Sequence, residues 1–421
     1  MKEIEIGIFE ASKDENIFVI GDIHGDYQCL IHCMVDLAKT CDIIGIEENE
    51  MNKNKEILGW KENNNSVVIF CGDLIHRKRF DHVLDDECSD VYILLSLLRL
   101  KKEAKSFGGD IILIAGNHEI MNLLNPNDTN YTSDLNIKMN KEFFTNENCI
   151  REYVKNSYAW IKLNDILLSH GGLCSDYLTY LENVDLKNEN IISYINKKYR
   201  DYFYTQDYLK LNPNDTNYNL FVKLDENASK HNIFWCRMWG YGVDCSVFEK
   251  TISKVDCKKM IVAHCPQFLH KAEPRMISFE CKDTTEYESY KLARIDLGMS
   301  RCFDYNKSDK FFYYLDNNYN RKITILKLLH INGDLVMNKN SIVTKKLSCI
   351  QYLLLKYGIS KDEWKNYNID TNWYGFESIN FDKHDCEQNK IDVIKCLLYP
   401  IYCENNDNVE SIIQYKKFIK L

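Results

Sequence analysis

Six short apolar runs constrain what this chain can fold into, because each one stops at a polar residue that can bind a metal or a proton. A strand buried on both faces has such a continuous apolar run, and the loop at its end is where a rigid scaffold holds reactive side chains. The runs lead into Gly21-Asp22, Gly72-Asp73, Gly116-Asn117-His118-Glu119, His170-Gly171-Gly172, His264-Cys265-Pro266-Gln267 and Asp296-Leu297-Gly298. The pattern predicts an α/β protein with its chemistry at strand ends.

The residue types at these ends favour a metal site. Aspartate and asparagine supply hard oxygen ligands and histidine supplies imidazole nitrogen, a mixture that suits Mn, Fe or Zn. A set rich in thiolates would instead indicate a closed structural zinc site or an iron–sulfur cluster. The 17 cysteines are scattered without a CxxC pair or a disulfide-scaffold spacing, which favours a reduced, intracellular and therefore cytoplasmic protein.

Composition limits the partners that we expect. At 421 residues, with 45% hydrophobic and 27% charged residues, the chain predicts one large domain or a domain with an appendage. The net charge of -9 argues against general binding to nucleic acid or to an anionic membrane. We see no pattern of a signal peptide, and the longest apolar runs are of strand length, far below a membrane span.

Hydrophobic periodicity predicts the elements between these strand ends. We expect a lead-in at Met1–Glu15, helices at Tyr27–Lys39, Asp90–Ser106 and Lys141–Lys155, a polar exposed insertion at Glu47–Asn65, a hairpin over Ala159–Ser169, helices and loops over Tyr177–Asn232, and a final core strand at Lys322–Leu328. After about Asn340 the strand-end motifs stop, and Leu347–Leu421 carries only short amphipathic runs, which predicts a helical extension.

The ordered motifs resemble those of the calcineurin-like metallophosphoesterases, and within them the phosphoprotein phosphatase branch. Further stretches are similar to the bacterial-type Shewanella-like phosphatases: Gly72-Asp73-Leu74-Ile75-His76-Arg77, Glu119-Ile120-Met121-Asn122, His264-Cys265-Pro266-Gln267 and Asp296-Leu297-Gly298-Met299-Ser300. One such motif is weak evidence, but five in order, each after an apolar run, are strong. The resemblance covers Ile17–Leu328 and not the C-terminal extension.

The resemblance implies a four-layer αββα sandwich of two mixed β-sheets flanked by helices. It places a catalytic domain at residues 1–338 and leaves residues 339–421 as a C-terminal helical extension of unknown role.

The resemblance also implies the site. Two divalent cations (Mn, Fe or Zn) would be bridged by Asp73, with Asp22 and His24 holding the first and Asn117, His170 and His264 holding the second. Cations about 3.5–4 Å apart lower the pKa of a bridging water, so no protein nucleophile is needed. Further residues have implied roles: Arg77 and Arg237 would grip the phosphate, His118 would protonate the leaving alkoxide, and His76 and Asp296 would support this set.

One residue departs from the family pattern. The family has aspartate where this chain has His76, and there the carboxylate hydrogen-bonds the acid histidine; Lys78 also replaces a glycine. The expected partner of His118 is therefore missing, unless Asp81 or Glu119 takes its place.

Three functions stay open on the sequence. The leading prediction is a phosphoprotein phosphatase that hydrolyses phosphomonoesters of Ser/Thr or Tyr with a metal-bridging hydroxide, so its partner would be a phosphoprotein or phosphopeptide. The second is a dinucleoside polyphosphate hydrolase, since related hydrolases share the motifs. The third is a scaffold pseudophosphatase, in which His76 would mark decayed chemistry; the intact metal-ligand positions argue against it.

Overall fold

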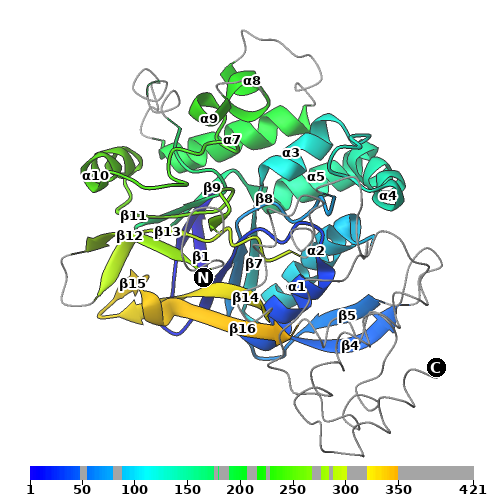
Figure 1. Cartoon of the computed structure of the whole chain (residues 1–421), viewed down its shortest axis with the longest axis horizontal. Coiled ribbons are helices and arrows are strands. Elements are labelled where there is room, and N and C mark those ends of the chain that lie inside the picture. The colour runs from blue at the N-terminus through cyan, green and yellow to red at the C-terminus, as the bar shows by residue number, and fades with distance from the viewer. Residues whose placement is uncertain are drawn as a thin grey trace, which may run out of the picture. The chain divides into compact units, whose positions relative to one another are not determined.

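The structure is a computed structural model that describes residues 1–47, 55–78, 88–174, 179, 189–205, 216–223, 228–267, 276–283, 288–300 and 320–348. The chain divides into two compact units, Met1–Tyr314 with Ile323–Lys345, and Leu315–Lys322 with Lys346–Leu421. The helices predicted after Leu347 lie outside the described residues. Figure 1 shows the helices and strands of the described residues.

The first sheet carries three of the predicted strand ends. Its order is β15 (Asp334–Val336), β14 (Asn320–Ile331), β3 (Ile17–Ile20), β6 (Val67–Phe70), β7 (Asp110–Ile114) and β8 (Ser157–Tyr158), and β16 (Ile342–Ser348) also pairs with β14. The central strands β3, β6 and β7 are parallel, whereas β14 runs antiparallel to β3. Every residue of β3 and β6 is buried, as their unbroken apolar sequences predict.

The second sheet carries the other three strand ends. Its order is β1 (Lys2–Glu5), β2 (Ile8–Glu10), β9 (Trp160–Leu163), β10 (Ile166–Ser169), β11 (Lys259–Val262), β13 (Ser289–Arg294) and β12 (Ser278–Asp283). Strands β10, β11 and β13 are parallel, whereas β9 is antiparallel to β10 and β12 is antiparallel to β13. Both sheets are therefore mixed, with parallel strands at the centre.

Helices flank the sheets (Figure 1). They are α1 (Tyr27–Ile31), the π-helical η1 (His32–Leu37), α2 (Asp90–Ser106), α3 (Asn117–Leu124), α4 (Asp134–Thr145), α5 (Glu147–Asn156), α7 (Ile191–Tyr204), α8 (Thr216–Phe221), α9 (Ala228–His231), α10 (Cys245–Ile252), and the short 3₁₀ turns η3 (Ser253–Val255) and η6 (Lys339–Ser341). Helix α2 has the predicted bounds: Val91, Leu94 and Leu98 are buried on one face. The predicted α/β fold of two mixed sheets flanked by helices is confirmed.

Three local expectations were wrong. The lead-in forms β1 and β2, which join the second sheet through β9. Part of the expected polar, exposed insertion is strand β5 (Lys55–Trp60), which forms a hairpin with β4 (Cys41–Glu47) and buries Leu58 and Trp60. The single helix expected at 141–155 is divided between α4 and α5, because Asn146 adopts an extended conformation and its side chain accepts hydrogen bonds from the backbone N–H groups of Asn148 and Cys149.

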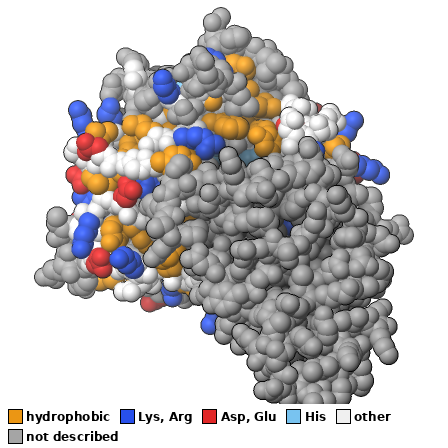
Figure 2. Space-filling model, in the orientation of Figure 1, with side chains coloured by type: hydrophobic (Ala, Val, Ile, Leu, Met, Phe, Trp, Pro, Cys, Tyr) orange, Lys and Arg blue, Asp and Glu red, His pale blue; other side chains and the backbone are white. Residues whose placement is uncertain are grey.

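Three further observations bear on composition. A disulfide joins Cys245 on α10 to Cys281 on β12, although the spacing of cysteines gave no indication of a bridge. Among the residues that the structure describes, no helix is long and apolar enough to cross a membrane. On the face shown in Figure 2, basic and acidic side chains are interspersed among hydrophobic ones in the described part of the surface.

Strand β16, which lies after residue 338, gives a test of the predicted boundary. Because β16 pairs with β14, and the Thr324 and Thr344 hydroxyls lie 3.0 Å apart, we expect a chain that ends at Asn338 to melt lower than one that ends at Ser348, on the order of 5 °C. Both should bind two metals, measured by elemental analysis, since the candidate ligands lie earlier. If the chain of residues 1–348 folds but binds no metal, part of the metal site must lie in the extension after Ser348.

Candidate metal centre

The six strand ends meet around one cavity: residues from five of them line it, and His170 from the sixth lies 3.3 Å from Asp73. The volume of the cavity is about 250 Å³, and its lining residues are Asp22, His24, Asp73, Asn117, His118, Tyr131, Trp235, Arg237, Tyr241, His264, Pro266 and Asp296. Three of the strands that lead to it (β3, β6 and β7) belong to one sheet and three (β10, β11 and β13) to the other. Because the carboxyl ends of parallel strands meet at one edge of a sheet, the arrangement brings residues from positions 22 to 296 together.

The backbone at the site is conformationally unusual. His24, Asp73, His76 and His264 have φ angles of 41°, 52°, 72° and 64°, in the left-handed region that residues other than glycine rarely adopt. Such conformations persist where the surrounding structure holds them, and they often occur at functional sites. Gly72 meets a different constraint, since a Cβ atom there would lie 2.6 Å from the Cα atom of Gly116. Glycine at position 72 lets these two loops touch.

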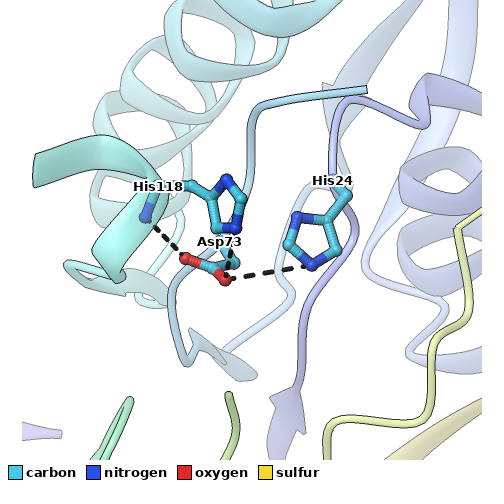
Figure 3. A group of neighbouring side chains, drawn as sticks. All are labelled: His24, Asp73 and His118. Carbon is cyan, nitrogen blue, oxygen red and sulfur yellow. Dashed lines mark hydrogen bonds and ion pairs between the residues drawn. The ribbon is translucent and has the colours of Figure 1, made fainter. Parts of the chain in front are cut away.

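Asp73 lies at the centre of the site. Figure 3 shows its carboxylate between the rings of His24 and His118. Its Oδ2 atom is 3.8 Å from His24 Nε2 and 3.7 Å from His118 Nε2, and its Oδ1 atom is 3.3 Å from His170 Nε2. Burial opposes ionisation, but His170 and His118 outweigh it and hold the pKa of Asp73 well below its usual value. The carboxylate is therefore charged and ready to bind cations.

Two groups of candidate ligand atoms share Asp73. One consists of His24, Asp73 and His118, the other of Asp73, His170 and His264, and within each group the ligand atoms lie within 4.8 Å of one another. Asp22 belongs beside the first group, with its Oδ2 atom 3.7 Å from His24 Nε2. The structure thus brings together all six residues predicted as metal ligands.

Asn117 completes the second group. Its side-chain oxygen lies 2.8 Å from His170 Nε2, and the atoms around it, which include His264 Nδ1 and the Asp73 carboxylate, are all acceptors. An amide oxygen that faces only acceptors is unfavourable unless the amide turns over or a cation is bound between them. These oxygen and nitrogen atoms, which all carry lone pairs directed at one another, are suited to bind a cation.

A buried atom without a partner points the same way. The Oδ1 atom of Asp22 has no hydrogen-bond partner, and a buried polar atom of this kind is costly. His264 Nε2 also has no partner, but the atom of this ring that lies beside Asn117 is Nδ1. The other two imidazoles are oriented by backbone carbonyls: His170 Nδ1 lies 2.8 Å from the oxygen of Cys71, and His24 Nδ1 lies 3.3 Å from the oxygen of Ile75. Such contacts direct Nε2 toward a metal. The residues present therefore fit two divalent cations.

Asp296 lies against Asp22. Burial raises the pKa of Asp296 to about 6, and the charge on Asp73 adds to this. The pKa of Asp22 is raised well above its usual value, by burial first and then by the negative charges of Asp296 and Asp73. In the absence of cations, two buried carboxyls so close hold a proton between them.

The sequence did not predict that a carboxylate holds these loops in place. Glu119 accepts hydrogen bonds from the backbone N–H groups of Asp73 (2.9 Å), Leu74 (2.7 Å) and Gly116 (2.8 Å), and so ties the loop after β6 to the start of α3. The signal was present, since Glu119 follows Asn117-His118 directly in the motif. It was considered only as a partner of His118.

The sequence predicted that His118 would lack its expected partner, but the ring of His76 contacts it. The two Nδ1 atoms are 2.7 Å apart. On its other side, the amide nitrogen of Asn122 contacts His76 Nε2. The ring of Tyr131 stacks on His76, with centroids 5.8 Å apart, and its edge meets His118. The sequence assigned no role to Asn122 or Tyr131, and the alternative partner Asp81 lies outside the described residues.

The two arginines predicted to grip phosphate occupy different environments. Arg237 is exposed, lines the cavity and donates to Cys265 Sγ at 3.8 Å. Arg77 is buried, is not among the residues that line the cavity, and pairs with Asp26 Oδ2 at 3.2 Å while lying 3.4 Å from Ser300 Oγ. Its role in phosphate binding stays a prediction, with less structural support than that of Arg237.

Comparison with known proteins identifies distant relatives of this chain. The chain is 25% identical to Shewanella-like protein phosphatase 1 of Plasmodium berghei over 331 residues, 74% of each chain. It is 23% identical to the uncharacterized protein R398 of Acanthamoeba polyphaga mimivirus, over 54% of this chain and 97% of that protein. The structure resembles a cold-active protein-tyrosine phosphatase of a psychrophilic Shewanella species (TM-score 0.51, 15% identity, 81% and 82% of the two chains), a likeness of fold. Residues 15–235 match the calcineurin-like phosphoesterase family, and the chain belongs to that family.

Proposed function

We propose that this protein is a phosphoprotein phosphatase that hydrolyses phosphomonoesters with two divalent cations of the Mn, Fe or Zn class. One observation carries the proposal: a charged, buried Asp73 is shared by two histidine-containing ligand groups at the floor of a cavity that Arg237 also lines. The family to which the chain belongs binds dinuclear metals, and this chain has two His/Asp clusters. The specificity for protein is supported by the relative named a Shewanella-like protein phosphatase.

The residues of the chain have separable roles in this reaction. Two cations, when bound, activate water and neutralise phosphate charge. Arg237, at the exposed side of the cavity, would bind the phosphate oxygens with its planar guanidinium. His118 faces the centre of the site through Nε2, where it can donate a hydrogen bond to the leaving oxygen. Tyr131, Trp235 and Tyr241 would contact the side chain that carries the phosphate.

The proposal is tested with the purified full-length chain. We would measure bound metal after loading with Mn, Fe or Zn, and then turnover of matched phosphoserine, phosphothreonine and phosphotyrosine peptides beside diadenosine tetraphosphate. Hydrolysis of the peptides with two metals bound supports the proposal. Preference for the dinucleotide would make the chain a polyphosphate hydrolase, and two bound metals without turnover of any substrate would make it a scaffold.

Replacement of Arg237 by alanine should weaken inhibition by vanadate, an analogue of phosphate. Hydrogen bonds to a charged group contribute about 1.5–3 kcal/mol, so the inhibition constant should rise by about ten- to a hundredfold. Arg151→Ala, an exposed arginine on α5 that pairs with Glu147, is the matched control and should change nothing. An unchanged constant in Arg237→Ala would exclude this arginine from the phosphate site.

A further inference from the structure

A disulfide joins helix α10 to the second sheet, close in sequence to residues that line the metal cavity. Cys245 is the first residue of α10, and Cys281 lies on β12, the last strand in the order of that sheet. Strand β12 pairs with β13 on both sides of Cys281, through Glu280 and Lys282. Cys281 is therefore a fixed point, to which the disulfide ties the start of α10.

The chain is fixed a second time before it reaches the disulfide, at Trp239 and Gly240. The buried indole of Trp239 donates to the backbone oxygen of Leu173 at 2.7 Å, and the backbone oxygen of Trp239 accepts from Nε of Arg294. The backbone oxygen of Gly240 accepts from Nε2 of Gln267 at 3.1 Å. These contacts hold the turn whether the disulfide is intact or reduced.

Residues 241–244 span the two fixed points with little packing of their own. Tyr241 is 38% exposed, and Gly242 is exposed as well. Gly242 has a φ angle of 53°, and a Cβ atom added there would meet no atom of the described residues within 4 Å beyond its chain neighbours. The next buried side chain is that of Phe248, whose ring packs on that of Trp239 with centroids 5.6 Å apart. The position of this segment therefore depends on the disulfide.

The segment carries a side chain of the cavity. Tyr241 lines the cavity together with Arg237, the residue proposed to bind the phosphate. Burial raises the pKa of Tyr241 to about 12, and Arg237 opposes this rise by its charge and by a hydrogen bond, so the two side chains are in contact. A tyrosine held in this place keeps the guanidinium in one orientation, which a bidentate grip on phosphate needs.

We propose that the Cys245–Cys281 disulfide positions Tyr241 against Arg237, so that a small thiol such as glutathione, by reducing the disulfide, lowers the affinity of the site for phosphate. The inference rests on the part of the proposed function in which Arg237 binds the phosphate. A thiolate attacks the sulfur of Cys245, which is more exposed than Cys281, and the electron pair of the broken S–S bond leaves on the sulfur of Cys281, which takes a proton. A second thiol then releases Cys245 as a thiol, and the two glutathione molecules leave as one oxidised glutathione.

The redox step is tested on the full-length, Mn-loaded protein, equilibrated with reduced and oxidised glutathione in varied ratio. Mass spectrometry after alkylation measures the fraction of molecules in which Cys245 and Cys281 are joined. We expect this fraction to fall as the share of reduced glutathione rises, and to recover when the ratio is reversed. A disulfide that stays intact in millimolar glutathione, or one that never forms, would overturn the proposal.

The affinity is measured by calorimetric titration with inorganic phosphate, which requires no turnover. An ordinary hydrogen bond corresponds to about two- to tenfold in affinity, so the Kd for phosphate should rise by about that factor in both Cys245→Ser and Cys281→Ser. In Tyr241→Phe, which lacks the hydroxyl, the Kd should be the same with the disulfide intact or reduced. Cys149→Ser, at a half-buried free cysteine on α5, is the matched control and should bind phosphate as the unmodified protein does.

Equal Kd values in the oxidised protein and in both serine variants, at unchanged metal content, would overturn the proposal. A redox effect of undiminished size in Tyr241→Phe would overturn it as well. If no form of the protein binds phosphate, the proposal fails together with the phosphate-binding role of Arg237. If phosphate binding follows the disulfide but no phosphopeptide is hydrolysed, the proposed function alone is contradicted.

Discussion

An Asp73→Asn protein is expected to fold and to lose both metals and turnover together. Asp73 belongs to both ligand groups, and its two oxygens face histidines on opposite sides. An amide offers one oxygen and no negative charge, so both groups lose the carboxylate that they share, and the second group keeps only the neutral ligands Asn117, His170 and His264. The cations supply several kcal/mol of transition-state stabilisation, which corresponds to a loss on the order of 10³-fold in rate.

The measurement compares metal content, circular dichroism and kcat in parallel. Asp42→Asn is the matched control, because Asp42 is an exposed aspartate on β4 that pairs with Lys61. It should keep both metals and normal turnover. An Asp73→Asn protein that is folded, holds two metals and turns over at the normal rate would show that Asp73 does not bridge.

The strand ends could be predicted because their local sequences are unambiguous. An unbroken apolar run such as Ile17–Ile20 or Val67–Phe70 is stable only when both faces are buried, and the structure buries every residue of both. The Gly-Asp that follows breaks the strand at the buried edge. Ligand positions could therefore be named from local sequence and family resemblance, and the structure brings them to one cavity.

The elements that were mispredicted depend on partners elsewhere in the chain. All residues of β1 are exposed, so no apolar pattern marks it, and it is a strand because β2 pairs with it and β2 pairs with β9. The break between α4 and α5 depends on Asn146, whose side chain competes for backbone N–H groups. From the sequence pattern alone, an asparagine at this position is predicted to lie on the exposed face of one continuous helix.

The support around the ligands was the hardest part to predict. Glu119, Asn122 and Tyr131 act through hydrogen bonds and ring contacts with residues some 40 to 55 positions away, which no spacing rule reveals. Arg77 shows the converse: its motif position predicted phosphate binding, whereas the structure buries it against Asp26. A motif fixes which residue is present, and the fold decides which group it meets.

Replacement of Asp296 by asparagine should stabilise the metal-free protein near neutral pH while weakening its metal site. The pKa of Asp296 is raised to about 6 by burial, so the proton that it binds on folding stabilises the protein fully below about pH 4. That contribution is lost as the pH rises through about 6. Above about pH 6 the folded protein holds the buried charge of Asp296 beside Asp22, which lowers the free energy of unfolding by an amount on the order of 3 kcal/mol.

The test is the difference in Tm between Asp296→Asn and the unmodified protein, measured from pH 4 to 7.5 with a chelator present. The difference should be near zero at pH 4 and reach several degrees in favour of the variant at pH 7.5. Using the difference cancels the titration of His170 and His264, which both proteins share. Asp283→Asn on β12 is the control and should show no trend with pH.

Added Mn should reverse the order of stability of the two proteins at pH 7.5. Cations neutralise the carboxylates and release the shared proton, so the unmodified protein should gain more in Tm from metal at pH 7.5 than the variant does. The repulsion between Asp22 and Asp296 is then a property of the empty site that metal binding relieves. A variant that is no more stable than the unmodified protein in chelator at pH 7.5 would show that these carboxyls do not repel one another, and that Asp296 serves the metal site without a cost in stability.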